Sequence, residues 1–383
     1  MVKAVMKLGI ENINEFKPLI INKNIGLITN FTGLTSNFNP TIDVLNKYSS
    51  VKKVFTLEHG LHGIVDPGQK VANYFDQTLK ITIHSLYGSQ FAPTTDELKD
   101  IDILVFDVQD IGVRYFTYIS SMFKLMQVAN KLNLPFLVMD RPLLLGRKMP
   151  LGQIIKPDFY SFVGMLPLPN YYGLTIGELA SWIKNTQLPN LNLFVSHLIN
   201  WNPELNVKEN GLPFVAPSPN LPSMNALRLY PGLCLLEGTN ISEGRGTVKP
   251  FEQLGAPWID EKEFTKVLQD YLKNSGVLFQ PVWFKPSSSK FCDKICKGVQ
   301  IHIVNHGFNP LIVAIKIIRV LLVLYPDKFK MDLVSPAIGT KHKFIEYLMG
   351  CKFHNLDDIE RLLVIFEKDY TPFYKIAREY YFY

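Results

Sequence analysis

Four carboxylates of this 383-residue sequence lie beside glycine or at the end of an apolar run, where acid–base chemistry is feasible. They are Glu58, Asp107, Asp140 and Glu243. Cleavage of a glycosidic bond uses one carboxyl group as an acid and a second group as a base, a nucleophile or a stabiliser of charge. Nearby basic side chains shift the pKa of a carboxyl toward either role. Paired-carboxylate hydrolysis is therefore one hypothesis, and the residue types alone do not choose among the four.

A glycine-rich stretch surrounds the last of these carboxylates. It spans residues 238–258 and reads GTNISEGRGTVKPFEQLGAPW, with Glu243 between glycines, Arg245 beside it and Asn240 before it. So much glycine does not suit the interior of a helix or a strand. The stretch instead predicts a loop whose backbone approaches another group closely. A tight turn with a solvated ion pair is the simpler interpretation of SEGRG alone, so the rest of the sequence has to decide.

Apolar segments in the first 145 residues predict a sheet that would position the other carboxylates. Strand-like segments alternate with helical patterns and lie at 24–30, 51–58, 81–87, 102–108 and 134–140. This alternation is typical of a mostly parallel sheet with helices on both faces. The predicted fold class is therefore α/β, beginning with a Rossmann-like domain.

Polar residues directly follow four of these strands. They are Asn30, Glu58, His59, Asp107, Gln109, Asp140 and Arg141. Ligands of open α/β sheets bind outside the carboxyl ends of the strands. One such residue would need no explanation beyond helix capping, because Asp and Asn are favoured N-caps. Polar residues after four successive strands instead favour a binding site at this edge of the sheet.

The length of the chain and its Pro- and Gly-rich segments predict two domains. At 383 residues the chain exceeds what one ordinary hydrophobic core supports. The segment 143–171 is rich in proline and glycine, and we place the boundary near residue 150. The prediction is a Rossmann-like α/β domain over 1–150, followed by a smaller α+β auxiliary domain over 151–383 that contributes the glycine-rich loop.

Two features of the second half have structural interpretations. Thr175 and Glu178 have the spacing of a capping box, which gives Glu178 a role in starting a helix. The apolar run 311–325 has fifteen residues and contains Lys316 and Arg319. A membrane span needs roughly 20 apolar residues, so this run predicts a buried helix.

Several cofactor classes lack their sequence signatures. The first strand is followed by TNFTGLTSN rather than G-x-G-x-x-G, and neither a P-loop nor a G-x-S-x-G motif occurs. Cys292, Cys296, His302 and His306 are of zinc-ligand type, but their spacing is too short for a zinc finger. We therefore expect no nucleotide cofactor and no metal, which disfavours a metal-dependent hydrolase.

Composition narrows the partners and the compartment. The net charge is +6, but the lysines are scattered and form no run suited to nucleic acid. Four cysteines in so long a chain do not form a disulfide framework, and the N-terminus shows no signal peptide. We expect no nucleic-acid partner, no membrane span and a cytoplasmic location.

Seven motifs occur together in an order that matches a known family. They are GLITNFTG, LEHGLHG, FDVQDIGVRYFTYI, MDRP, GLTIGELA, PSPNLPS and YPGLCLLEGTNISEGRGTVKPFEQLGAPW. With these motifs the chain resembles the exo-β-N-acetylmuramidase family over nearly its whole length, from about Ile25 onward. The resemblance implies a cleft between two domains and no nucleotide cofactor. It also implies release of non-reducing terminal N-acetylmuramic acid (MurNAc) from β-1,4-linked peptidoglycan fragments in cell-wall recycling.

The resemblance also implies roles for individual residues. Glu58 of LEHG corresponds to the catalytic acid, and Glu243 and Asp107 are the further catalytic candidates. The substrate-binding candidates are Asn30, His59, Gln109, Arg114, Asp140, Arg141, Asn220, Asn240 and Arg245. Arginines suit the lactyl carboxylate of the sugar, because a planar guanidinium binds a carboxylate through two hydrogen bonds.

The sequence departs from the family pattern at several positions. His62 stands where the family usually has Arg, Leu143 and Leu144 replace Asn-Pro, and Tyr171 with Tyr172 replace the usual His. A secretion signal, common in relatives, is missing. These changes remove polar groups near the sheet edge, which is compatible with altered specificity or reduced activity. The alternative function is a non-catalytic muropeptide- or sugar-binding protein that has kept the cleft. The intact LEHG and SEGRGT motifs favour an enzyme.

Overall fold

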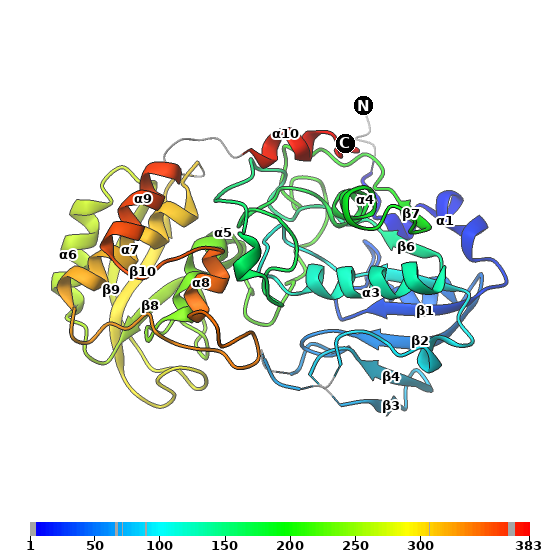
Figure 1. Cartoon of the computed structure of the whole chain (residues 1–383), viewed down its shortest axis with the longest axis horizontal. Coiled ribbons are helices and arrows are strands. Elements are labelled where there is room, and N and C mark those ends of the chain that lie inside the picture. The colour runs from blue at the N-terminus through cyan, green and yellow to red at the C-terminus, as the bar shows by residue number, and fades with distance from the viewer. Residues whose placement is uncertain (1–4, 66–67, 71, 89, 306, 367–371) are drawn as a thin grey trace.

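The computed structural model describes residues 5–65, 68–70, 72–88, 90–305, 307–366 and 372–383, and it contains two sheets (Figure 1). The larger sheet has seven strands in the order β3-β4-β2-β1-β5-β6-β7. The strands are β1 (Asn24–Thr29), β2 (Ser50–Thr56), β3 (Tyr74–Asp76), β4 (Ile81–Ser85), β5 (Ile103–Asp107), β6 (Phe136–Met139) and β7 (Leu193–Ser196). All neighbours are parallel except β3 with β4. The predicted mostly parallel α/β sheet is confirmed.

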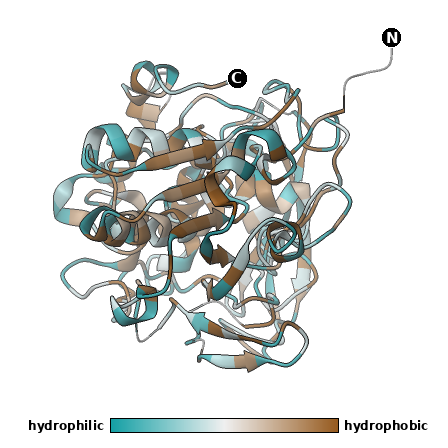
Figure 2. Cartoon of the chain, turned by 90° about the vertical axis from the view of Figure 1, so that its right-hand side faces the viewer, coloured by the Kyte–Doolittle hydropathy of each residue, from teal (hydrophilic) through white to brown (hydrophobic). Residues whose placement is uncertain are grey.

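Helices cover both faces of this sheet. They are α1 (Ile13–Ile20), α2 (Thr41–Leu45), α3 (Tyr118–Leu132) and α4 (Ile176–Gln187), with short 3-10 helices η1 (Gly9–Glu11), η2 (Asp96–Leu98) and η3 (Pro157–Phe159). The connection through α2 and those through α3 and α4 run in opposite directions along the sheet. Because such crossovers are right-handed, their helices lie on opposite faces. The central strands of the sheet are mostly hydrophobic (Figure 2). Every residue of β5 is buried.

The chain reverses its direction across the sheet between β1 and β5. These strands are neighbours at the centre of the sheet, and Thr29 pairs in register with Asp107. The Thr29 hydroxyl donates to the carbonyl of Asp107 at 3.0 Å. A reversal of this kind leaves a crevice outside the strand ends, which is where α/β sheets commonly bind ligands.

The second half of the chain forms a smaller α+β unit, as predicted. Its sheet is antiparallel in the order β8-β10-β9. Its elements are α5 (Met224–Leu233), η4 (Cys234–Gly238), β8 (Gln253–Ala256), α6 (Glu261–Tyr271), β9 (Val277–Phe284), β10 (Cys296–Ile303), α7 (Pro310–Leu324), α8 (Phe344–Met349) and α9 (Leu356–Phe366). The predicted buried helix is α7, which packs against α5, α6 and α9. Within the described ranges, no helix is long and apolar enough to cross a membrane.

The connection between the two units is not a single crossing near residue 150. Strand β7 lies well beyond that position and pairs in parallel with β6 of the first sheet. The chain therefore returns to the first sheet before it enters the second. Proline and glycine content alone could not predict this return, because strand pairing is a long-range contact. The domain boundary predicted near residue 150 therefore missed it.

The predicted capping box at the start of α4 is confirmed. The Thr175 hydroxyl accepts from the Glu178 amide, and the Glu178 carboxylate accepts from the Thr175 amide. Both oxygens of Glu178 also accept from Arg147, at 2.8 and 2.9 Å. Glu178 is fully buried, so these donors are what make its charge tolerable. Its role is structural, as the spacing indicated.

The C-terminal segment returns to the first unit and is fastened there. Helix α10 (Phe373–Arg378) lies beside the first unit, and the C-terminus ends close to the N-terminal segment (Figure 1). The Tyr383 hydroxyl donates to Asp140 at 2.8 Å and accepts from the Leu198 amide at 2.7 Å. The Arg147 guanidinium lies 3.7 Å from the centroid of the Tyr381 ring. The last residues thus contact Asp140, Leu198 and Arg147, which belong to the first unit.

We expect Tyr383→Phe to destabilise the protein. The substitution leaves the Leu198 amide and one oxygen of the buried Asp140 without this partner, which costs about 1–3 kcal/mol for unpaired buried groups. The free energy of unfolding, measured by chemical denaturation, is the readout. Tyr380→Phe is the matched control, because the Tyr380 hydroxyl has no hydrogen bond to the residues that the structure describes. Equal stability of the two variants would contradict the fastening role of Tyr383.

Candidate active site

A cavity of about 480 Å³ lies between the two units. Residues from both units line it, from the segments that follow β2, β4 and β5 on one side and from the glycine-rich loop on the other. The polar residues of its lining include Glu58, Gln69, Tyr87, Thr117, Asn220, Glu237, Glu243, Arg245 and Lys290. A volume of this size is typical of a small-molecule site.

Glu58 enters the cavity from the turn after β2, where its carboxylate is held by three donors. The Gly68 amide and the Tyr87 hydroxyl both donate to Oε1 at 3.0 Å, and the Thr117 hydroxyl donates to Oε2 at 2.5 Å. Burial, and then the nearby Glu58 charge, raise the pKa of the Tyr87 hydroxyl above its usual value. Tyr87 therefore keeps its proton and remains a donor. These contacts fix the orientation of the carboxylate toward the cavity.

His59 fastens the turn that carries Glu58. Its φ is +72°, in the left-handed region that non-glycine residues seldom occupy, and Gly60 follows at +73°. Its ring nitrogen Nδ1 lies 2.9 Å from the carbonyl of Val65, and Nε2 lies 3.1 Å from the hydroxyl of Ser218. The imidazole thus ties the turn to the PSPN loop. A strained backbone held by such contacts is common at functional sites.

The glycine-rich loop supplies the charged wall of the cavity. Glu243 is almost fully buried, with Oε2 at 3.0 Å from Lys290 Nζ and Oε1 at 3.5 Å from Arg245 Nε. Arg245 also donates to Glu237 Oε1, from Nη2 at 2.6 Å and from Nε at 3.2 Å. Two carboxylates and two cations therefore form one connected network on this wall. The interpretation of SEGRG as a tight turn with a solvated ion pair is wrong, because Glu243 is buried.

Two glycines make this packing possible. Gly244 and Gly246 have φ of +83° and +75°, where a side chain would be strained. A Cβ on Gly246 would also lie 2.5 Å from the carbonyl oxygen of Ser288. The loop therefore packs directly on the segment that carries Lys290, as the glycine content predicted.

One donor of Arg245 is left over. Burial alone would lower the pKa of its guanidinium, but Glu237 and Glu243 more than offset this and raise that pKa above its usual value. Its Nη1 is buried and has no hydrogen-bond partner among the described residues. Asn220 lies on the same cavity, and its side chain likewise makes no hydrogen bond to the part of the chain that the structure describes. The Asn220 side chain is therefore available to a ligand, whereas Nη1 of Arg245 is a buried donor, and only the exposed part of the Arg245 side chain faces the cavity.

Comparison with known proteins identifies the family. The N-terminal family model described as exo-β-N-acetylmuramidase NamZ matches residues 25–225, and the C-terminal model of the same description matches residues 228–383. This chain belongs to the NamZ family. The peptidoglycan β-N-acetylmuramidase NamZ of Bacillus subtilis (strain 168) is 35% identical over 100% of this chain and 92% of its own length.

Solved structures of relatives agree with this assignment. A DUF1343 family protein from Bacteroides fragilis NCTC 9343 is 30% identical, with a TM-score of 0.86, over 99% of both chains. A second DUF1343 family protein from the same organism is 26% identical, with a TM-score of 0.71, also over 99% of both chains. The fold described above is thus the fold of the NamZ family.

The cavity gathers five of the residues that the sequence predicted for a NamZ site. Glu58, Asn220, Glu243 and Arg245 line it, and His59 lines a small adjoining recess of about 40 Å³. Sequence reasoning missed Tyr87, Thr117 and Lys290 as functional candidates. Thr117 lies inside the FDVQDIGVRYFTYI motif, which was a usable signal. Lys290 lies in no motif, and only the fold brings it to Glu243.

Asp107 does not reach this cavity, although it was a catalytic candidate. Its carboxylate is fully buried and is bound by Arg141, from Nε at 2.5 Å and from Nη2 at 2.9 Å. It also accepts from the Thr41 hydroxyl. With both oxygens occupied, Asp107 serves to hold the strand ends together. The local sequence does not reveal this, because Arg141 is 34 residues away.

Asp140 and Arg114 are likewise engaged inside the protein. Asp140 accepts from Thr175, Gly177 and Tyr383 at 2.8–2.9 Å, and burial followed by Glu178 raises its pKa to about 6. The Arg114 guanidinium donates to the carbonyls of Gln153, Leu168 and Leu348. Both side chains are fully buried and neither lines the cavity, so the structure does not support their predicted contact with substrate.

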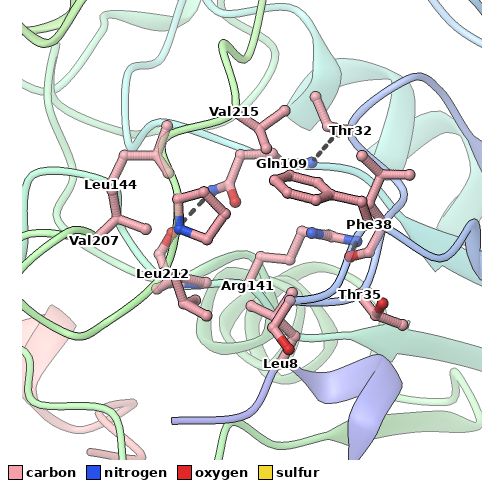
Figure 3. Close-up of a pocket in the computed structure, with 14 residues that line it drawn as sticks. Leu8, Thr32, Thr35, Phe38, Gln109, Arg141, Leu144, Val207, Leu212 and Val215 are labelled. Atoms are coloured by element: carbon pink, nitrogen blue, oxygen red, sulfur yellow. Dashed lines mark hydrogen bonds between the residues drawn. The ribbon is translucent and has the colours of Figure 1, made fainter.

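Four other predicted binding residues lie elsewhere. Gln109 and Arg141 line a separate small pocket of about 30 Å³, where the Gln109 amide group donates to the carbonyls of Asp110 and Pro142 (Figure 3). Asn30 holds the turn after β1 by accepting from Thr32. Asn240 ties the glycine-rich loop to the segment 328–330. These residues shape the strand ends and the loop rather than the cavity surface.

The departures from the NamZ pattern are accommodated by packing. Leu143 and Leu144 are buried, and the buried Tyr172 donates to Asp110, whose pKa burial raises to about 6. His62 lies near the surface and pairs with Asp76 at 3.0 Å. None of these residues lines the cavity of about 480 Å³.

The metal-ligand types noted in the sequence do not come together in the described residues. No group of three or more His, Cys, Asp or Glu suited to a metal occurs among them. His302 pairs with Gln280 on the exposed face of the second sheet. His306 lies outside the described residues.

We expect His59→Ala to slow the hydrolysis of a β-N-acetylmuramide, the reaction in the name of the family. The variant loses both ring contacts that hold the Glu58 turn, and a misplaced catalytic group lowers rate by about 10²-fold. The hydrolysis rate of His59→Asn should fall less than that of His59→Ala, because Asn tolerates a positive φ. Initial rates and the melting temperature of both variants are the measurements, with His62→Ala as the control. A rate loss no larger than that of His62→Ala would exclude this positioning role.

Proposed function

We propose that this chain is an exo-acting glycoside hydrolase that releases terminal MurNAc from β-1,4-linked peptidoglycan fragments during cell-wall turnover. One observation carries the proposal: the LEHG acid and the SEGRGT carboxylate, from opposite halves of the chain, line one cavity together with two cations. The activity in the names of the family and of the Bacillus subtilis relative supports it. Peptidoglycan is the corresponding substrate class.

Glu58 is the proposed general acid. A glycosidase acid must give its proton to the leaving oxygen and then exist as a carboxylate. Two of the three partners of Glu58 are the hydroxyls of Tyr87 and Thr117. A hydroxyl donates to a carboxylate and accepts from a protonated acid, so the same contacts accommodate both forms. The partly exposed position of Glu58 lets the proton reach a bound substrate.

Glu243 is the proposed partner of the acid. Its two oxygens face the cationic side chains of Lys290 and Arg245. A fixed negative charge stabilises the oxocarbenium-like transition state of glycoside cleavage. Lys290 is then a positioning residue, because it acts through Glu243 and also binds the carbonyls of Leu236 and Ile241.

Arg245 is the proposed determinant for the muramyl sugar. MurNAc differs from N-acetylglucosamine (GlcNAc) by a lactyl ether that ends in a carboxylate. Arg245 lines the cavity with a partly exposed side chain, and its guanidinium stays cationic. A carboxylate is the ligand that such a donor binds most strongly.

We expect Glu58→Gln to lower the turnover rate of a MurNAc-β-1,4-GlcNAc disaccharide by about 10²–10⁴-fold. The loss should be smaller on an activated aryl β-N-acetylmuramide, because a good leaving group needs little protonation. Rates on both substrates, with circular dichroism to verify folding, are the measurements. Glu204→Gln, at an exposed carboxylate, is the control. Equal losses on both substrates would rule out the acid role, and wild-type binding without turnover would establish the sugar-binding alternative.

We expect Arg245→Gln to weaken binding of MurNAc but not of GlcNAc. A hydrogen bond to a charged group contributes about 1.5–3 kcal/mol, so the dissociation constant for MurNAc should rise by about 10- to 100-fold. Competitive inhibition by the two monosaccharides measures this difference. Because GlcNAc lacks the lactyl carboxylate, it serves as the internal control for damage to the cavity. An equal rise for both sugars would contradict lactyl recognition by Arg245.

A further inference from the structure

An aromatic cluster lies beside Glu58, and apart from the Tyr87 hydroxyl it has no part in the chemistry described above. It consists of Tyr87, Phe91 and Phe162, which we call the aromatic wall. Ring centroids are 6.0 Å apart for Tyr87 and Phe91, 6.1 Å for Tyr87 and Phe162, and 4.4 Å for Phe91 and Phe162. All three rings are half-buried, so part of each remains accessible. Two segments far apart in the sequence, after β4 and after η3, build the wall.

We propose that the aromatic wall is the subsite for the leaving sugar, an uncharged N-acetylhexosamine whose glycosidic oxygen receives the proton of Glu58 as its bond to C1 of MurNAc breaks. The inference rests on the proposed function and extends it to the second half of the substrate. It concerns which residues bind the sugar next to the cleaved bond, a role that no motif assigned.

The position of the wall relative to the acid is the first argument. A general acid must lie within hydrogen-bond reach of the leaving oxygen, about 2.6–3.2 Å. The Tyr87 hydroxyl lies 3.0 Å from Glu58 Oε1. The wall therefore begins one hydrogen bond away from the proton donor. The sugar attached through the protonated oxygen has to lie in this neighbourhood.

The uneven charge of the cavity is the second argument. The wall built by the glycine-rich loop holds Glu237, Glu243, Arg245 and Lys290. A terminal sugar with a carboxylate suits that charged side. The leaving sugar carries no charge and has nothing to gain there. The rings of Tyr87, Phe91 and Phe162 are uncharged and suit the uncharged sugar, so the two walls match the two sugars in one orientation.

The surface chemistry of the sugar is the third argument. A pyranose ring presents a face of C–H groups, and its acetamido substituent ends in a methyl group. Such surfaces pack on aromatic rings, which dominate contact energetics in binding sites. Tyr87 and Val163, the neighbour of Phe162, both line the cavity. Phe91 and Phe162 are not in that lining but contact the Tyr87 ring, so the aromatic wall adjoins the cavity through Tyr87.

Binding to the Glu58→Gln protein tests the subsite without turnover. Isothermal titration calorimetry compares MurNAc with the MurNAc-β-1,4-GlcNAc disaccharide, before and after Phe162→Leu or Phe91→Leu. Leucine keeps apolar volume and removes the ring, which preserves the packing between the two segments. We expect the dissociation constant of the disaccharide to rise about ten-fold, equivalent to about 1.4 kcal/mol, while that of MurNAc is unchanged. Phe75→Leu, at an exposed phenylalanine on β3, is the matched control and should change neither.

Three results would overturn the inference. The disaccharide affinity could stay the same, or both affinities could fall together, which is the pattern of a purely structural cluster. Alternatively, the variants could weaken the binding of a muramyl dipeptide and leave the binding of the disaccharide unchanged. That result would assign the aromatic wall to the stem peptide. Failure of the Glu58→Gln protein to bind either MurNAc or the disaccharide is a different result. That outcome would reject the proposed function itself.

Discussion

The buried guanidinium of Arg114 is the interaction on which the arrangement of the two units depends. It donates to the carbonyls of Leu168 at 2.9 Å and of Leu348 at 2.6 Å, which belong to opposite sides of the junction. A fully buried charge is costly unless its donors are satisfied, so these carbonyls are held firmly. Burial lowers the pKa of Arg114 to about 10, which still leaves it cationic at neutral pH. Breaking this contact would leave an unpaired charge in the interior.

The residues after Arg114 carry this constraint to the cavity. The Tyr115 hydroxyl donates to the carbonyl of Pro231 in α5, and the Thr117 hydroxyl donates to Glu58. Three residues of the segment 114–117 therefore link the junction, the second unit and the proposed acid. Because the cavity has walls from both units, its geometry depends on how rigidly this segment is held. Such rigidity is what a preorganised site requires.

The cavity itself is built from unequal sides. Its charged side depends on a network in which Arg245 and Lys290 balance Glu237 and Glu243. Its other side combines the hydroxyls that hold Glu58 with the half-buried rings of the aromatic wall. One side is suited to a carboxylate and the other to an uncharged ring. The proposed substrate, a charged sugar joined to an uncharged one, has the same asymmetry.

Local features of the sequence predicted the features that depend on local physics. The alternation of apolar segments predicted the parallel sheet, the spacing of Thr175 and Glu178 predicted a helix start, and the glycines around Glu243 predicted a closely packed loop. The motifs were sufficient to identify the family. Each of these signals lies within a few residues, where backbone sterics and capping act.

Only the tertiary structure separated carboxylates that look alike in sequence. Glu58 and Asp107 both follow apolar strands, yet Asp107 is neutralised by Arg141 while Glu58 faces the cavity. Lys290 meets Glu243 from 47 residues away, and the return of β7 to the first sheet is equally long-range. The sequence by itself determined which residue types were present and which backbone each segment prefers. The fold decided which of those residues share a cavity, because that depends on long-range packing and charge pairing that no local pattern records.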